Sequence, residues 1–181
     1  DIPIAVFQNN VMSTINLFEA IRMVCPEAVV LLASTSETYG NPVEFPMKES
    51  HPNRPVNVYS ASKMSQEALA MAYAQSWGLK IIITRAFAYY NAKRKDLFAT
   101  AFAMQVARIE QGKQEVLLHG NLNSVRQMMN VKDMVRAYWI ASEKCQYNTP
   151  YNIGGKDIMS VGEYLEKLIS YANVPIVCKE N

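Results

Sequence analysis

The sequence has few of the residues that build metal centres, disulfide frameworks and membrane spans. Its only histidines are His51 and His119, and because two lone histidines do not make a ligand set, we expect no metal. The three cysteines are isolated and lack metal-ligand spacing, which predicts reduced thiols in a cytoplasmic protein. No apolar run is long enough to cross a bilayer, so we expect no membrane partner.

Two further absences concern phosphate and nucleic acid. The seven glycines nowhere form the Gly-rich turn between a strand and a helix with which dinucleotide-binding domains hold a pyrophosphate. The net charge of +2 is mild and no basic stripe is present, so we expect no nucleic-acid partner. Half of the 181 residues are hydrophobic, which is ample for a folded core.

The pattern of apolar runs predicts alternating strands and helices. The run Ala28–Ala33 is typical of a strand that is buried on both faces, and Leu79–Thr84 repeats the pattern. Alternation of this kind predicts an α/β fold with a doubly wound parallel sheet. The helices that we expect cover about 7–24, 56–77, 98–111, 134–144 and 160–172, and short strands are expected at 115–119 and 151–153.

One stretch carries a chemical signature. Polar residues 34–37 (Ser-Thr-Ser-Glu) directly follow the first predicted strand, at the sheet edge where open parallel sheets bind ligands. Tyr59 and Lys63 follow four residues apart, which places them one turn apart on a helix. An ammonium group near a phenol favours the phenolate, which can take a proton from a sugar hydroxyl. Glu37 would supply a second proton-transfer group. The alternative is a solvent-facing helix pair beside a surface carboxylate.

Several segments together resemble a known family. The chain is similar to the extended short-chain dehydrogenase/reductases, or NAD-dependent epimerase/dehydratase family, that act on nucleotide sugars. Within them it most resembles the GDP-mannose 4,6-dehydratases. The resemblance rests on Ala33–Gly40, Tyr59–Lys63, Arg85–Phe87, Arg94, His119–Leu122, Arg126, Val131–Asp133 and Tyr151–Gly154.

This resemblance implies a partial Rossmann fold with a small C-terminal substrate-binding portion. Residues 1–90 would form the later part of the nucleotide-binding domain. Residues 91–181 would be mostly substrate-binding, interleaved with returning Rossmann elements. The family's first strands and its Gly-rich loop would lie before Asp1, and their absence would expose an apolar sheet edge. Helices around 7–24 and 56–77 correspond to those through which the family dimerises, so we expect a homo-oligomer.

The resemblance also implies a reaction and a set of site residues. The reaction would be that of a lyase, which converts GDP-mannose to GDP-4-keto-6-deoxymannose while NADP is recycled. The implied residues are Thr35, Glu37, Tyr59 and Lys63 for catalysis, Ser36 and Arg126 for the substrate, and Lys63, Tyr89 and Arg94 for the cofactor.

Some positions depart from the family pattern and leave alternatives open. Ala88 and Tyr89 replace an asparagine and a histidine, and Gln127 replaces an aspartate. Arg126 could be an exposed loop arginine, and Arg94 could belong to a solvated basic turn. A related nucleotide-sugar reductase, epimerase or decarboxylase is therefore a second hypothesis. A catalytically inactive relative that binds a ligand or a partner is the third.

Overall fold

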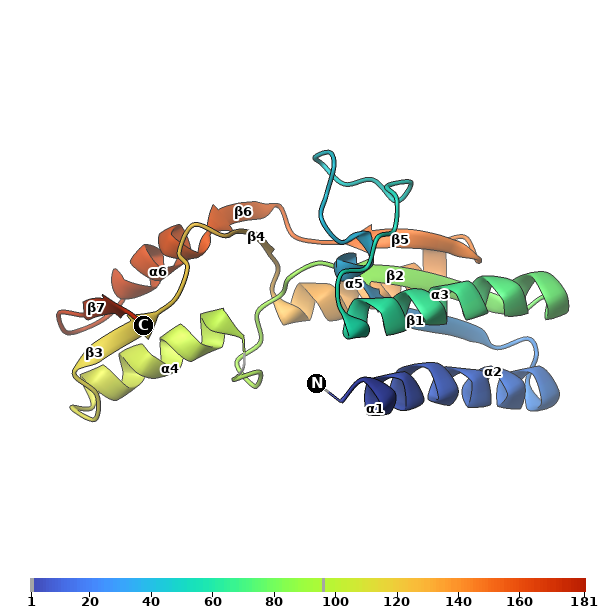
Figure 1. Ribbon diagram of the computed structural model, residues 1–181, viewed down its shortest axis with the longest axis horizontal. Coiled ribbons are helices and arrows are strands. Elements are labelled where there is room, and N and C mark those ends of the chain that lie inside the picture. The colour runs from blue at the N-terminus through green and yellow to red at the C-terminus, as the bar shows by residue number, and fades with distance from the viewer. Residues whose placement is uncertain (1, 96) are drawn as a thin grey trace. The chain divides into compact units, whose positions relative to one another are not determined.

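The computed structural model describes residues 2–95 and 97–181, which form two compact units. The first unit runs to Phe87 and takes in Val135–Ile153, whereas the second combines Ala88–Met134 with Gly154–Asn181. The chain thus leaves the first unit, builds most of the second and returns before completing it. Figure 1 shows the course of the chain through the elements of each unit.

A three-stranded parallel sheet forms the centre of the first unit. Its strands are β1 (Val29–Thr35), β2 (Lys80–Ala86) and β5 (Thr149–Ile153), in the order β1-β2-β5. The register pairs Thr35 with Ala86 and Ala86 with Ile153, so the three carboxyl ends lie level. The parallel sheet that the sequence predicts is therefore confirmed, and its carboxyl edge is in place for a ligand site.

Helices cover one face of this sheet. The first helical run consists of α1 (Pro3–Phe7), the π-helical turn η1 (Gln8–Met12) and α2 (Ser13–Val24), and it packs beside α3 (Val58–Trp77). The run begins at Pro3 rather than near Phe7, because proline suits the first turn of a helix, where its missing N–H costs nothing. The buried cluster beneath contains Phe18, Leu32, Ala70, Tyr73, Leu79, Ile81 and Ile83.

Strand β1 forms an open edge of the sheet. Among the described residues its only hydrogen-bonded neighbour is β2, and Val29 on it is 42% exposed. Parallel sheets normally have both faces and edges covered, so an exposed apolar strand is unusual. The exposed apolar edge that the sequence predicts is therefore present.

The second unit is built around α4 (Phe98–Glu110) and α6 (Val161–Ile169). Strand β3 (Val116–His119) pairs in parallel with β7 (Val177–Glu180), and β4 (Val125–Met128) pairs antiparallel with β6 (Asp157–Ser160). The core contains Phe102, Val106, Leu117, Val161 and Leu165. Ser160 and Glu163 form the capping box that the sequence predicts, and it starts α6.

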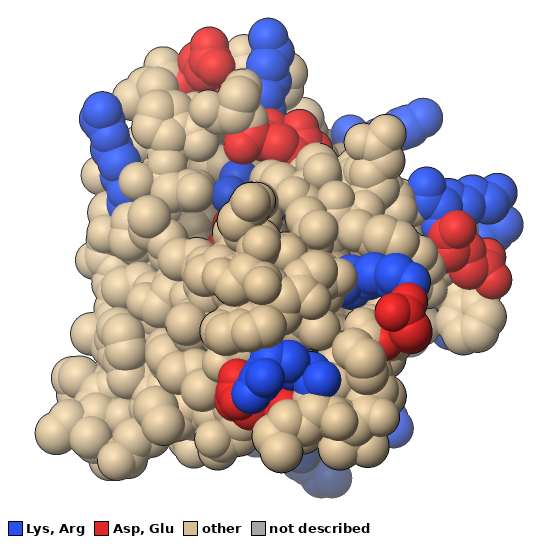
Figure 2. All heavy atoms as spheres, turned by 90° about the vertical axis from the view of Figure 1, so that its right-hand side faces the viewer, with Lys and Arg blue, Asp and Glu red and all other residues tan. Residues whose placement is uncertain are grey.

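Helix α5 (Val131–Lys144) begins in the second unit and leads back to β5 in the first. No helix in the part of the chain that the structure describes is long and apolar enough to cross a membrane. On the face shown in Figure 2, acidic and basic side chains lie next to one another between uncharged residues. Two surface ion pairs of the first unit, Arg22–Glu19 and Lys80–Glu27, illustrate this mixing.

Candidate active site

The polar turn after β1 is shaped by its own hydrogen bonds. Residues Ser36–Tyr39 form the short 3-10 helix η2, with Thr35 as its N-cap. The Thr35 hydroxyl accepts a hydrogen bond from the Glu37 N–H at 3.3 Å. Gly40 ends the turn with φ +67°, and a side chain there would collide with the Arg54 carbonyl. The turn therefore leaves the Glu37 carboxylate exposed while Thr35 is buried.

The tyrosine and the lysine lie in the first two turns of α3. Asn57 caps this helix, since its side chain accepts a hydrogen bond from the Ser60 N–H at 2.7 Å. The Lys63 Nζ lies 6.0 Å from the centre of the Tyr59 ring. It also donates a hydrogen bond to the Ala33 carbonyl of β1, at 2.9 Å. The predicted stacking of the two side chains is therefore present, and Lys63 joins α3 to the sheet edge.

The environment of Lys63 suits a group that binds a ligand. Burial lowers the pKa of its ammonium group from the ordinary value, because desolvation disfavours the charged form. An ammonium has three donors, and the bond to Ala33 uses one of them. The remaining donors are available to a polyhydroxylated ligand.

A hydrogen bond links η2, which carries Glu37, to the N-cap of α3, the helix that carries Tyr59. The Asn57 Nδ2 donates to the Glu37 Oε2 at 3.0 Å, while the Asn57 Oδ1 caps α3. Both ends of one amide are thus used, one on Glu37 and one on the helix that begins just before Tyr59. We did not predict a role for Asn57 from the sequence. The signal that could have found it is a capping residue two positions ahead of Tyr59.

The remaining predicted residue of the first unit, Ser36, lies half-buried at the start of η2. Arg85, one of the residues on which the family resemblance rests, is not an exposed residue at the carboxyl edge of the sheet. It is the sixth residue of β2 and is buried, where it forms an ion pair with Glu67 at 2.7 Å.

The other predicted binding residues belong to the second unit. Arg126 is exposed on β4, and its Nη1 donates to the Val125 carbonyl at 3.1 Å. Arg94 is exposed in the turn after Asn91, whereas Tyr89 is half-buried. The structure thus brings five of the eight predicted residues to the carboxyl end of one sheet, and it places Tyr89, Arg94 and Arg126 within the second unit.

The glycine pair of the second unit is used for packing. A side chain at Gly155 would lie 1.9 Å from the Met128 carbonyl, and one at Gly154 would meet the Gln127 side chain at 2.6 Å. Gln127 in turn donates a hydrogen bond to the Gly155 carbonyl. Gln127 and Met128 of β4 therefore fill the space beside the two glycines that a phosphate would need, so Gly154–Gly155 is not a pyrophosphate-binding turn.

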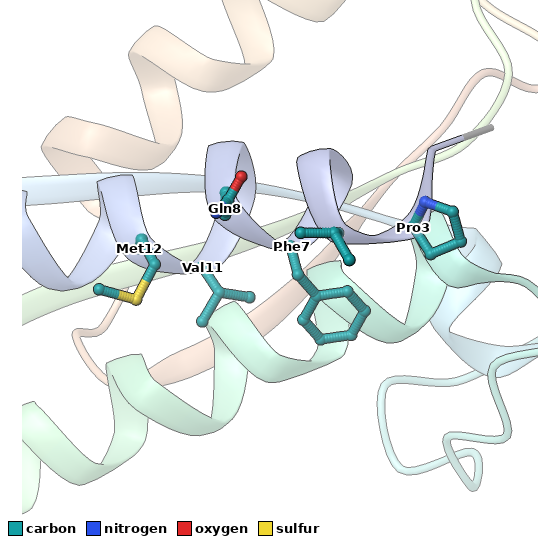
Figure 3. A pocket seen from close by; sticks show the side chains of 6 residues that line it. Pro3, Phe7, Gln8, Val11 and Met12 are labelled. Atoms are coloured by element: carbon teal, nitrogen blue, oxygen red, sulfur yellow. The ribbon is translucent and has the colours of Figure 1, made fainter.

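The described surface has hollows, two of which are defined by the residues that line them. One, of about 400 Å³, lies along the first helical run, where Pro3, Phe7, Val11 and Met12 line it (Figure 3). The other, of about 360 Å³, lies in the second unit between Tyr90–Ala92, the small residues of α4 and Tyr164. Burial raises the pKa of the Tyr164 hydroxyl, which therefore stays neutral at physiological pH. Neither hollow is lined by the predicted catalytic residues.

No group of three or more potential metal ligands among His, Cys, Asp and Glu occurs in residues 2–95 and 97–181. The phenol of Tyr59, the ammonium of Lys63 and the carboxylate of Glu37 lie at one sheet edge, where they can perform proton transfer.

Comparison with known proteins identifies the family. The family model described as GDP-mannose 4,6 dehydratase matches residues 1–181, and the chain therefore belongs to this family. Its structural neighbours lie in the wider NAD-dependent epimerase/dehydratase family.

Two curated relatives illustrate the degree of similarity. The GDP-6-deoxy-D-mannose reductase of Pseudomonas aeruginosa is 28% identical over 178 residues, which is 96% of this chain and 59% of that protein. The GDP-mannose 4,6-dehydratase of Yersinia enterocolitica is 30% identical over 168 residues, or 91% of this chain and 45% of that protein. The chain thus spans about half the length of these relatives.

Solved structures agree on the fold. The structure described as RMD from Pseudomonas aeruginosa complexed with NADPH has a TM-score of 0.92 at 24% identity, and it covers 97% of this chain and 60% of that one. The structure described as a putative epimerase from Burkholderia cenocepacia has a TM-score of 0.86 at 27% identity, and it covers 99% of this chain and 58% of that one. The α/β fold with Rossmann-like neighbours is therefore confirmed.

Proposed function

We propose that this chain carries the catalytic residues of a nucleotide-sugar 4,6-dehydratase, a lyase that converts GDP-mannose to GDP-4-keto-6-deoxymannose. The observation that carries the proposal is the hydrogen bond from Asn57 to Glu37, since it joins the carboxylate to the helix of Tyr59 and Lys63. A reductase or a 4-epimerase has little use for a carboxylate at that place. A dehydratase needs one, because a proton must leave C5 as water leaves C6.

These side chains would transfer protons at C4, C5 and C6 of the sugar or hold the sugar in place. Tyr59 would take the proton from the C4 hydroxyl, and the neighbouring Lys63 would stabilise the phenolate. Glu37 would remove the C5 proton from its exposed position. Together with Thr35, it would pass that proton to the C6 hydroxyl as water departs. A proton from solvent would return to C5 through Glu37 when hydride reaches C6. Ser36 would hold the sugar beside them.

The second unit would bind the rest of the substrate and part of the cofactor. Arg126 has the planar, permanently charged guanidinium that grips a diphosphate, and its exposed position leaves it accessible. Tyr89 and Arg94 would contact the cofactor, and the hollow beside Tyr164 would receive part of the sugar nucleotide.

NADP, when bound, would supply the hydride acceptor at C4 and the hydride donor at C6. The residues of this chain fit its nicotinamide end, because a phenol and an ammonium lie together at the carboxyl end of the sheet. They do not fit its pyrophosphate, since strand packing occupies the glycine pair. We therefore propose that a Gly-rich loop outside these 181 residues holds the pyrophosphate. Residues 1–90 would then serve the cofactor and residues 91–181 mostly the substrate, interleaved with the elements at 135–153 that return to the first unit.

We also propose a cytoplasmic homo-oligomer that forms through the first helical run and α3. Large apolar side chains on these helices are exposed, namely Ile4, Met12, Leu17, Met71 and Trp77. Sedimentation of the purified chain tests this directly. A monomer at all concentrations would contradict it.

The function is tested by the mass of the product. The chain is incubated with GDP-mannose and NADP, and we expect a product that is lighter by one water. An isomer of unchanged mass would indicate an epimerase instead. A gain of two hydrogens by GDP-4-keto-6-deoxymannose, supplied together with NADPH, would indicate a reductase. Loss of carbon dioxide from a nucleotide-linked uronic acid would indicate a decarboxylase.

Calorimetric titration separates catalysis from simple binding. NADP and GDP-mannose are added singly and then together. Binding of GDP-mannose with weak binding of NADP is the expected result, because the pyrophosphate grip is missing. Tight binding of NADP would show that the cofactor site is complete. Binding of neither compound would refute the enzyme hypothesis and favour the interaction module.

A further inference from the structure

A buried ion pair lies beneath the candidate site and has no part in the proton transfers described above. The carboxylate of Glu67 on α3 accepts hydrogen bonds from the Arg85 Nε at 3.1 and 3.2 Å and from its Nη2 at 2.7 Å. The side chains are only 7% and 5% exposed. Burying two charges is costly unless their remaining hydrogen-bonding positions are filled, so the other contacts of the pair matter.

These contacts reach both ends of the segment 34–39, which carries Thr35 and Glu37. At its start, the Ser34 hydroxyl donates a hydrogen bond to Glu67 Oε1. At its end, the Arg85 Nη1 donates to the Tyr39 hydroxyl at 2.9 Å. Tyr39 is fully buried, and the Arg85 guanidinium also stacks over its ring at 4.8 Å. Thr35 and Glu37 lie between these two attachment points.

The same network holds the long loop that follows the turn. Arg85 Nη1 donates to the Glu49 carbonyl at 3.0 Å, and the Tyr39 hydroxyl donates to Asn152 Oδ1 at 2.6 Å. Asn152 in turn donates through Nδ2 to the Met47 carbonyl at 3.0 Å and through its N–H to Glu49 Oε1 at 2.9 Å. These hydrogen bonds therefore fix the loop at Met47 and Glu49, before the chain reaches Asn57.

Glu67 lies on the face of α3 that carries the tyrosine and the lysine. It is four residues after Lys63 and eight after Tyr59, so the three project from one side of the helix. Burial alone would lower the pKa of Arg85, but its hydrogen bonds to Glu67 and Tyr39 outweigh burial and raise it. The guanidinium therefore remains charged.

We propose that the Glu67–Arg85 pair is the positioning device of this site, which holds the turn carrying Thr35 and Glu37 against the helix carrying Tyr59 and Lys63. The inference rests on the proposed function only for the catalytic roles of those four residues. Its geometric content, that the pair fixes the turn and the loop, stands independently.

The test uses Tyr39→Phe, because this change removes one hydroxyl and keeps the buried ring. The backbone amides of residues 36–57 should then exchange with deuterated solvent about tenfold faster, since the charge-assisted hydrogen bond that closes the network is lost. The amides of Ile81–Ile83 in β2 should keep their wild-type rates. Glu27→Gln is the control, because it breaks an ion pair of the same 2.7 Å separation at the surface. It should leave both sets of amides unchanged.

The same variant separates positioning from bulk stability in turnover. With GDP-mannose and NADP, Tyr39→Phe should lower kcat about tenfold and leave KM unchanged, because Glu37 is displaced while binding groups remain. Unchanged exchange in 36–57, equal acceleration in β2, or a rise in KM alone would overturn the proposal. If the wild-type chain shows no turnover, the proposed function fails. The exchange rates, which need no substrate, then decide the positioning claim.

Discussion

The two units hold their predicted site residues in opposite ways. In the first unit, Glu37 and Lys63 are each hydrogen-bonded to another element, through Asn57 and Ala33 respectively. In the second unit, the Arg126 side chain donates, among the residues that the structure describes, only to the carbonyl of the residue before it. Side chains that perform proton transfer must be placed within a fraction of an ångström. A guanidinium that binds a flexible diphosphate does not need to be held in place before the ligand arrives, so it can lie exposed.

This contrast implies different consequences of substitution in the two units. Changes in the first should reduce the rate of the chemical step or the stability of the fold. Changes in the second should weaken substrate binding. The predictions below test that division, from the largest expected effect to the smallest.

Tyr59→Phe should have the largest effect. Removing the phenolic hydroxyl removes the group that we propose as the general base for the C4 hydroxyl, so turnover should fall by about 10³- to 10⁴-fold. Steady-state assays of the 4-keto product measure this. Tyr147→Phe, which alters an exposed tyrosine of the same unit, is the matched control and should retain full activity. Similar losses in both variants would refute the catalytic role.

Glu67→Ala should reveal the cost of breaking the buried pair. It leaves the Arg85 guanidinium buried without its partner, and the free energy of unfolding should fall by about 3–5 kcal/mol. Urea denaturation followed by circular dichroism measures the change. Glu27→Ala breaks the surface pair with Lys80 and should have no measurable effect. An equally small effect at Glu67 would contradict the distinction between the two pairs.

Arg126→Ala should sharpen the contrast between the units. Loss of the guanidinium should raise KM for the nucleotide sugar about tenfold and leave kcat unchanged, because the diphosphate is bound equally in the ground and transition states. Arg126→Lys should recover only part of this binding. Arg108→Ala, at an exposed position of α4 in the same unit, is the control. A fall in kcat would place Arg126 in the chemical step instead.

The smallest effect is a pH dependence that comes from Lys63. Burial lowers its pKa in the folded chain, so below its ordinary value of 10.5 the unfolded chain binds more protons. The free energy of unfolding of the wild type should therefore rise with pH through this window, relative to Lys63→Met. Solvent screening makes the difference small, because the ammonium is only partly buried. Parallel denaturation curves at neutral and alkaline pH measure it, and identical trends would contradict the assignment.

The sequence predicted most of the first unit. Apolar runs predicted β1 and β2, because buried parallel strands leave a strong local signal. The short strand expected at 151–153 is confirmed as part of β5. The sequence did not predict β4, β6 or β7, since each has four residues and, unlike the equally short β3, none contains three consecutive apolar residues. Strands of that length show too little alternation to be recognised.

The candidate site was predicted in part. The motif residues of the first unit could be found because their spacing along β1 and α3 determines where they meet. Asn57 was missed because the predicted helix began at residue 56, which placed Asn57 inside the helix, whereas it is the N-cap of α3 and also holds Glu37. The pairing of Glu67 with Arg85 joins a helix to a strand, and only tertiary packing brings the two together. The catalytic and binding roles remain predictions.

The central claim is that Tyr59 and Glu37 act on the same sugar, and incubation in deuterated water tests it most directly. The chain is supplied with GDP-mannose and NADP, and the product is examined by NMR. Because the exposed Glu37 carboxylate exchanges its proton with solvent, the 4-keto-6-deoxy product should carry deuterium at C5. Glu37→Gln should abolish this incorporation. A product without deuterium at C5, or incorporation that survives Glu37→Gln, would contradict the account.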